Sequence, residues 1–114
     1  MKGVIRLRES QHSNFQKFKE LMPGIGAKYA EDTSEVYKDG ALDAKTKRLM
    51  ALTGALVHGC TACILAQTDR ALESGGSAEE IIEACAVAMS LGGTKAAGES
   101  TCVIQYLGEL GIID

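Results

Sequence analysis

The chain has 114 residues, of which 46% are hydrophobic and 24% charged, so it is long enough for one folded domain and too apolar for a disordered chain. Its net charge of -3 argues against nucleic acid or an anionic membrane as the main partner, because both attract basic surfaces. With two Phe, three Tyr and no Trp, a core must be built from aliphatic and small side chains, which favours packed helices. We expect a single helical domain over residues 1–114.

No segment predicts export or a membrane anchor. The first residues include basic side chains but no apolar stretch long enough for a signal peptide. Residues 49–68 carry no charge, but His58 and Gly59 interrupt them, so we expect two buried helices rather than one span of about 20 apolar residues. The chain is therefore expected in the cytosol, where a Cys-x-x-Cys motif is more typical of redox or metal chemistry than of a structural disulfide.

Two short helices are expected before residue 40. Residues 14–21 place Phe15, Phe18 and Leu21 on one helix face, and the polar segment before them leaves His12 on the surface. Pro23 indicates a break. A second helix is expected over residues 27–37, ended by the Asp-Gly pair at 39–40.

The segment 43–57 is expected to be a helix with Asp43 as its N-cap. Residues 50–57 leave almost no polar face, and a helix that is apolar all round must be buried all round. A chain of this size buries a limited share of its surface, so part of that burial should come from a second subunit. The sequence therefore predicts a homo-oligomer.

Three more helices are expected towards the C-terminus. The first begins near Cys60 and ends before Gly75, and the second opens with a capping box formed by Ser77 and Glu80. The pair Gly92-Gly93 should end that helix, and a last one capped by Thr94 should run to about residue 110. Because no alternating strand pattern occurs, we predict an all-α fold of six or seven helices.

The Cys60-Thr-Ala-Cys63 motif at a predicted helix start has a clear chemical use. Residues three apart share a helix face, so their sulfurs can form a disulfide. First-turn N–H groups and the helix dipole stabilise a thiolate there, and the thiolate is the reactive form. Gln67 lies on the same stripe as Cys63. From spacing alone, a redox role and a packing role for the two cysteines both remain open.

A metal site is less well supported than a redox pair. A structural zinc site needs four ligands, whereas Cys60, Cys63 and His58 supply three. Cys85 and Cys102 are spaced as single packed thiols, which are usually inert. For His58, next to the motif, a role as a base and a role in capping a helix end both stay open. No metal or cofactor is predicted.

Four blocks in order make the chain similar to the carboxymuconolactone decarboxylase family: residues 39–52, the motif at 59–64, residues 71–84, and Gly92-Gly93. The resemblance covers roughly residues 35–107. It implies an all-α oligomer, often a hexamer built as a trimer of dimers. Members with a Cys-x-x-Cys motif resemble alkylhydroperoxidase D, a thiol peroxidase and disulfide reductase partnered by dihydrolipoyl proteins, whereas the true decarboxylases generally lack the pair.

Two positions depart from the redox members of this family. Those members carry a Glu twelve residues before the first cysteine and a His four residues after the second, as a proton relay. Here these positions hold Arg48 and Gln67. Arg48 cannot accept a proton at neutral pH and Gln67 cannot shuttle one, so the usual relay is absent.

Our first hypothesis is a thiol oxidoreductase of peroxidase or disulfide reductase type, with Cys60 and Cys63 as the couple. Arg48 would activate the thiolate by charge, His58 would carry protons, and Gln67 would donate a hydrogen bond. Its partners would be a small-molecule substrate, a dithiol protein reductant and other copies of the chain, as a trimer or hexamer. The alternatives are a lyase in which Arg48 grips a substrate carboxylate, and a non-catalytic oligomeric scaffold. Which cysteine attacks first is left open.

Overall fold

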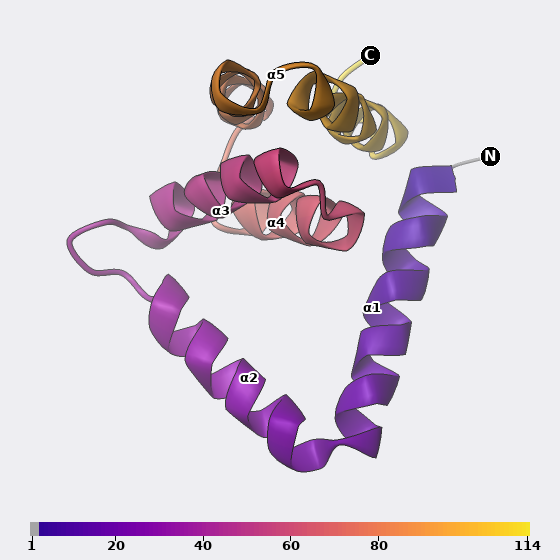
Figure 1. Cartoon of the computed structure of the whole chain (residues 1–114), viewed down its shortest axis with the longest axis vertical. Helices are drawn as coiled ribbons and strands as arrows, with labels where there is room; N and C mark the ends of the chain where they lie inside the picture. Colours follow the sequence, from indigo (N-terminus) through magenta and orange to yellow (C-terminus); the bar gives the residue numbers. More distant parts are fainter. Residues whose placement is uncertain (1–2) are drawn as a thin grey trace.

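The computed structural model describes residues 3–114, and every regular element in this range is an α-helix (Figure 1). The five helices are α1 (Gly3–Leu21), α2 (Pro23–Tyr37), α3 (Ala44–His58), α4 (Thr61–Glu73) and α5 (Ala78–Glu109). The predicted all-α fold is confirmed, but the prediction of six or seven helices is wrong. The last two expected helices form one bent helix, because Gly93 adopts φ 61° and ψ -140° and the chain turns there without a loop.

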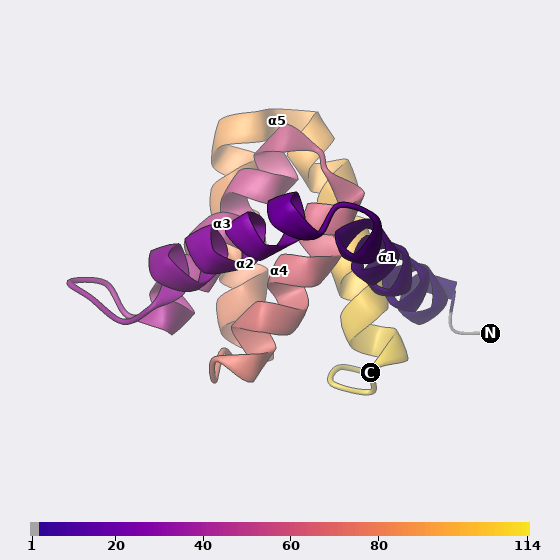
Figure 2. The same cartoon turned by 90° about the horizontal axis from the view of Figure 1, so that it is seen from below.

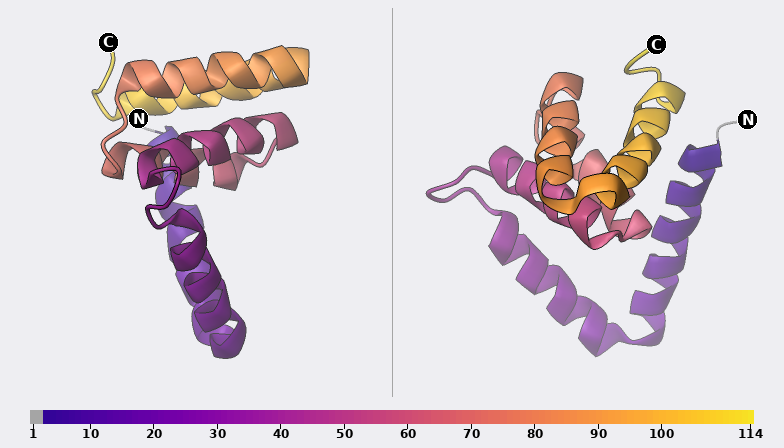
Figure 3. Two further views of the ribbon diagram at one scale, coloured as in Figure 1. Left: turned by 90° about the vertical axis from the view of Figure 1, so that its left-hand side faces the viewer. Right: turned by 45° about the horizontal axis from the view of Figure 1, so that its top comes forward.

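The helices form a body and an arm. Helices α3 and α4 lie side by side, and the two halves of α5 cover them as a second layer (Figure 3). Helices α1 and α2 form a V that projects from the side of α3 and α4 facing away from α5. The V lies in front of the body when the molecule is seen from below (Figure 2). We call α1 and α2 together the arm.

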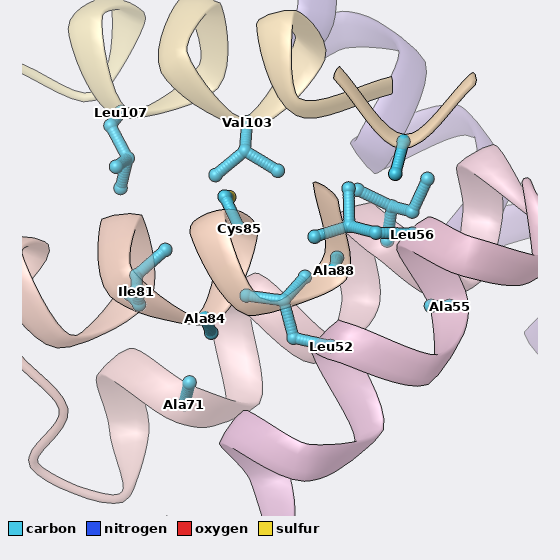
Figure 4. Packing of buried hydrophobic residues seen from close by; sticks show 12 residues of the cluster. Leu52, Ala55, Leu56, Ala71, Ile81, Ala84, Cys85, Ala88, Val103 and Leu107 are labelled. Atoms are coloured by element: carbon cyan, nitrogen blue, oxygen red, sulfur yellow. The ribbon is translucent and has the colours of Figure 1, made fainter. Parts of the chain in front are cut away.

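Buried aliphatic residues of α3, α4 and α5 form the main core. Leu52 and Leu56 of α3 pack with Val103 and Leu107 of α5, and all four are fully buried (Figure 4). The same face of α3 was expected to be apolar. The outward face of α3 exposes Met50, so the apolar circumference of this helix is only partly covered within one chain.

Local capping signals give the starts of α3 and α5. The carboxylate of Asp43 accepts a hydrogen bond from the backbone N–H of Thr46 at 2.8 Å. Ser77 and Glu80 make both bonds of a capping box, at 3.1 and 2.9 Å. These two predictions are confirmed, since each cap satisfies N–H groups that a helix start would otherwise leave unpaired.

The first two helices are longer than the predicted segments 14–21 and 27–37. The first turn of α1 is held by the carboxylate of Glu109, at the far end of the chain, which accepts the N–H groups of Val4 and Ile5, each at 2.9 Å. Helix α2 begins at Pro23 itself, where proline is well tolerated because the first-turn N–H has no helical partner. The predicted break is therefore a single residue, Met22.

A polar cluster ties the arm to the body. Asp69 of α4 accepts hydrogen bonds from Arg8 Nε of α1, at 2.6 Å, and from the hydroxyl of Tyr106 of α5. Burial, followed by the bond to Asp69, raises the pKa of Tyr106 above its ordinary value of 10.0. A charged carboxylate with two donors is a strong tie, so this cluster fixes where α1 meets α4 and α5.

Replacing Tyr106 tests this cluster. We expect Tyr106→Phe to lower the free energy of unfolding by about 1–3 kcal/mol near neutral pH, because the change leaves a carboxylate oxygen without its donor. The folded-state pKa of Tyr106 is raised, so its stabilisation is present below pH 10.0 and is lost as the pH rises further. The difference between the wild type and Tyr106→Phe should therefore shrink above pH 10.0.

Urea denaturation at neutral and alkaline pH measures both effects. Tyr29→Phe is the matched control, because Tyr29 is exposed on the arm and the loss of its hydroxyl group should change stability little. Equal unfolding free energies for Tyr106→Phe and the control at neutral pH would contradict the assignment.

Candidate active site

The cysteine pair lies where the chain turns from α3 into α4. Gly59 ends α3 in the left-handed conformation, with φ 83° and ψ 33°, and Cys60 is the N-cap of α4. This φ is accessible to glycine and costly for a residue with a Cβ atom. The turn therefore puts Cys60 at the cap of α4 and Cys63 in its first turn, as the spacing predicted.

The two cysteines are joined as a disulfide, and their Cα atoms are 5.2 Å apart. Cys60 Sγ also accepts a hydrogen bond from the backbone N–H of Cys63 at 3.2 Å. Cys63 is exposed, whereas Cys60 is half-buried. After reduction, the helix N-terminus would stabilise a thiolate on Cys60, while Cys63 is the sulfur more accessible to a molecule from solution.

The two residues that depart from the family's relay contact each other. Arg48 of α3 donates from Nη1 to Gln67 Oε1 of α4 at 3.1 Å. The guanidinium also lies 3.5 Å from the ring centroid of Tyr37, which belongs to α2. Burial lowers the pKa of Arg48, yet an arginine stays charged near neutral pH. The head group of Arg48 thus joins α2, α3 and α4.

Tyr37 and Lys95 are the two residues near this site that the sequence reasoning missed. Tyr37 lies in the segment 27–37, which was expected to be a helix, and nothing local to it indicates an arginine partner. Lys95 of α5 donates to the carbonyl oxygen of His58 at 3.1 Å, across 37 residues of sequence. A hydrogen bond between residues so far apart along the chain produces no periodic pattern in the sequence.

His58 is the last residue of α3 and is exposed, rather than part of a longer turn. Within residues 3–114, no hydrogen bond joins its imidazole, or the Arg48 guanidinium, to either cysteine sulfur. The predicted roles of His58 in proton transfer and of Arg48 in activating a thiolate therefore stay predictions.

The two remaining cysteines lie away from the pair. Cys85 is buried in the main core, as expected, and Cys102 is half-buried. Burial raises the pKa of both thiols, and Glu99 and Glu109 add to the effect at Cys102. Over the described residues 3–114, no group of three His, Cys, Asp or Glu side chains is arranged to hold a metal ion, and no helix is long and apolar enough to cross a bilayer.

Comparison with known proteins places most of the chain in one family. The profile of the Carboxymuconolactone decarboxylase family matches residues 24–101. An uncharacterized protein of Cupriavidus necator is 32% identical over 73 residues, which are 64% of this chain and 65% of that protein. Uncharacterized protein 4 in the cox locus of Paracoccus denitrificans is 35% identical over 75 residues, covering 66% of this chain and 68% of that protein. The match thus spans just under two-thirds of the first relative's length.

Solved structures agree with this fold. A carboxymuconolactone decarboxylase family protein of Legionella pneumophila gives a TM-score of 0.88 over 96% of this chain and 97% of that one, at 24% identity. A family protein of Thermotoga maritima gives 0.69 at 35% identity, over 75% of this chain and 88% of that one. A role in the antioxidative response has been suggested for the Thermotoga protein.

The four thiols should separate into two classes. After full reduction, we expect two thiols to react fast with an alkylating reagent near neutral pH and two to react slowly, because Cys85 and Cys102 are shielded and their pKa values are raised. Mild oxidation with diamide should form only the Cys60–Cys63 bridge. Peptide mapping by mass spectrometry reads both results, and a bridge that includes Cys85 or Cys102 would contradict the assignment.

Proposed function

The chain belongs to the carboxymuconolactone decarboxylase family, and we propose that it is a thiol oxidoreductase with Cys60 and Cys63 as its working couple. The observation that carries the proposal is a disulfide at an accessible helix N-terminus, with Cys63 exposed to solution. The antioxidative role suggested for the Thermotoga relative supports the same chemistry. A dithiol couple needs a reducing compartment to be regenerated, so we place the protein in the cytosol.

In the oxidative half-reaction, an organic hydroperoxide is the proposed small-molecule substrate. The Cys63 thiolate attacks the terminal peroxide oxygen, the O–O bond breaks, and the alkoxide takes up a proton and leaves as the alcohol. Cys63 is then a sulfenic acid. The Cys60 thiol attacks that sulfur and releases water, so the peroxide has gained two electrons and the pair has become the disulfide.

In the reductive half-reaction, a protein dithiol supplies the two electrons. Its thiolate attacks the exposed Cys63 sulfur, and Cys60 leaves as the thiolate that the first-turn N–H of Cys63 stabilises. The second thiol of the donor resolves the mixed disulfide, leaving the donor oxidised and the pair reduced. The exposure of Cys63 and the position of Cys60 at the helix N-terminus thus give the two cysteines different roles. Cys63 reacts with the substrate or the protein dithiol, and Cys60 forms and releases the internal disulfide.

The contacts of Arg48 favour this function over a lyase. A lyase would use Arg48 to grip a substrate carboxylate, but its guanidinium is engaged by Gln67 and Tyr37. In the oxidoreductase we propose that Arg48 contributes positive charge to the site, that Gln67 orients it, and that the exposed His58 exchanges protons with solvent. A scaffold without catalysis would show no turnover at all.

Turnover of an alkyl hydroperoxide with a dihydrolipoyl protein as reductant tests the proposal. We expect measurable activity in the wild type and a loss of at least about 100-fold in Cys60→Ser and in Cys63→Ser, because each change removes one member of the couple. Cys85→Ser is the matched control and should keep its activity, since this thiol is buried in the core. Wild-type protein that is folded but inactive towards hydroperoxides and small disulfides would contradict the proposal.

A gain-of-function variant sharpens the same assay. Because Arg48 and Gln67 are in contact, Arg48→Glu combined with Gln67→His would place a carboxylate beside an imidazole where the redox relatives have their relay. The rate of the double variant should exceed that of the wild type by about 10-fold or more, the scale of general acid–base catalysis. Either single change alone should not give this increase.

We also propose that the working form is a homo-oligomer. The chain exposes 6828 Å², compared with about 6000 Å² expected for a folded monomer of its mass. The excess of about 800 Å² equals the area that one partner buries in a standard interface. The radius of gyration, 14.3 Å, is also larger than the roughly 13 Å of a compact chain of this length.

Two separate apolar surfaces are candidates for such an interface. The arm exposes large side chains that include Phe18, Leu21 and Ile25, while its buried residues are only Val4 and Gly26. A groove of about 350 Å³ runs between the two halves of α5 and is lined by apolar side chains, among them Ile82, Met89 and Ile104. Most of the stability of a helix in a protein comes from tertiary packing of its apolar face, so we expect another chain to bury the apolar face of the arm. Two different patches on one chain allow a closed assembly larger than a dimer, such as a hexamer.

Light scattering at micromolar concentration should give a mass several times the 12.0 kDa of the chain. Leu21→Glu on the arm and Ile104→Glu in the groove should each reduce the assembly to a smaller species, and the double variant should be monomeric, because a buried unpaired charge is costly in an interface. Ser13→Glu is the control, on an exposed polar position of α1. A monomeric wild type would refute the assembly without affecting the thiol chemistry.

A further inference from the structure

Lys95 reaches the cysteine turn from the other side of the fold. It lies two residues beyond Gly93, where α5 bends, and its Nζ donates to the carbonyl oxygen of His58 at 3.1 Å. That carbonyl belongs to the last turn of α3, where a cation is favourable because the helix C-terminus carries partial negative charge. One side chain thus joins the second half of α5 to His58, the residue just before Gly59 and Cys60.

The packing of Lys95 on Gly59 is tight. A Cβ atom added to Gly59 would lie 2.6 Å from Lys95 Cε and 3.0 Å from Lys95 Nζ. The ammonium group therefore lies directly against the residue before Cys60. The bend of α5 permits this approach: just before it, Gly92 faces Val57 of α3, and a Cβ atom added to Gly92 would lie 3.0 Å from the Cβ atom of Ala96 and 3.6 Å from the Cα atom of Val57.

Few other charges face this turn. Residues 49–57 of α3 and residues 61–68 of α4 carry no charged side chain. Arg8 and the other charged groups of α1 that pack on α4 lie beside Asp69, in the second half of α4. On α5, the next charged residue is Glu99, which acts on Cys102. The groups at the turn itself are the imidazole of His58 and the ammonium of Lys95, while the guanidinium of Arg48 lies further along α3, where it pairs with Gln67.

We propose that Lys95 is a positioning residue of the cysteine pair: its hydrogen bond holds the turn that presents Cys60, and its charge favours the thiolate once the pair is reduced. A cation near a sulfur and the N-terminus of α4 act in the same direction, because both stabilise negative charge. The inference rests on the proposed function only in taking Cys60 and Cys63 as the working couple. It needs no particular substrate.

Three substitutions separate the hydrogen bond from the charge. Lys95→Arg keeps both, Lys95→Gln keeps a donor for the His58 carbonyl but loses the charge, and Lys95→Met loses both. The measurement is the alkylation rate of the fast thiols in the reduced protein as a function of pH, with the melting temperature recorded beside it. Lys28→Met is the control, because Lys28 is an exposed lysine on α2.

We expect Lys95→Gln and Lys95→Met to move the alkylation profile to higher pH and to slow the reaction near neutral pH by roughly three- to tenfold, the effect of a half to one pKa unit. Lys95→Arg and the control should follow the wild type. The difference between the wild type and Lys95→Gln should shrink in about 1 M salt, where charges are screened within a few ångströms.

A Lys95→Gln profile identical to that of the wild type would overturn the charge effect, and a melting temperature unchanged in Lys95→Met would overturn the hydrogen bond. Alkylation requires no turnover, so the two proposals can fail separately. A protein without peroxidase activity whose thiol reactivity depends on Lys95 would refute the enzyme and keep the inference. An active protein whose thiol reactivity does not depend on Lys95 would support the enzyme and refute the inference.

Discussion

The short turn between α3 and α4 is the constraint on which the rest of this structure depends. The left-handed conformation of Gly59 lets two backbone N–H groups, those of Gly59 and Cys60, bond to the carbonyl of Ala55 at 2.8 and 3.2 Å. The turn therefore ends one helix and begins the next within two residues. It places α4 beside α3, exposes the first turn of α4, and puts a cysteine at the N-cap, where the free N–H groups of that turn are available to a sulfur.

Several side-chain polar contacts of the chain join different helices. Asp69 and Glu109 bind α1 at separate points, and Arg48 joins α3 to α2 and α4. These bonds orient the arm, but they bury little apolar surface of it. Orientation without burial is what a segment needs if its hydrophobic side chains are to be covered by another copy of the chain, because the arm is then already in place when the copies meet.

The site differs from its redox relatives in how protons and charge are handled. A carboxylate and an imidazole form the relay in those relatives, whereas Arg48 and Gln67 contact each other here. Replacing both members of a contacting pair keeps a hydrogen bond between the same two helices and removes the group that accepts a proton. In the proposed function, the reactive group would be a thiolate stabilised by positive charge and by a helix N-terminus, with protons exchanged through solvent.

Elements whose signals are local could be predicted from the amino-acid sequence. The Asp43 cap, the Ser77 capping box and the spacing of Cys60 and Cys63 each involve residues within a few positions of one another, and the structure has all three. The break expected at Gly92-Gly93 is present as a bend within α5. The family resemblance was equally local, since it depended on blocks in order along the chain.

Features that join distant residues depend on how the helices pack and could not be predicted in this way. Glu109 binds the first turn of α1 from the other end of the chain, and Lys95 meets His58 because α5 bends by the right amount. The pairing of Arg48 with Gln67 requires α3 and α4 to lie side by side at one register. No sequence pattern carries such information, because a hydrogen bond across many residues is set by the packing of whole helices, whereas a cap or a turn is set by the few residues that form it.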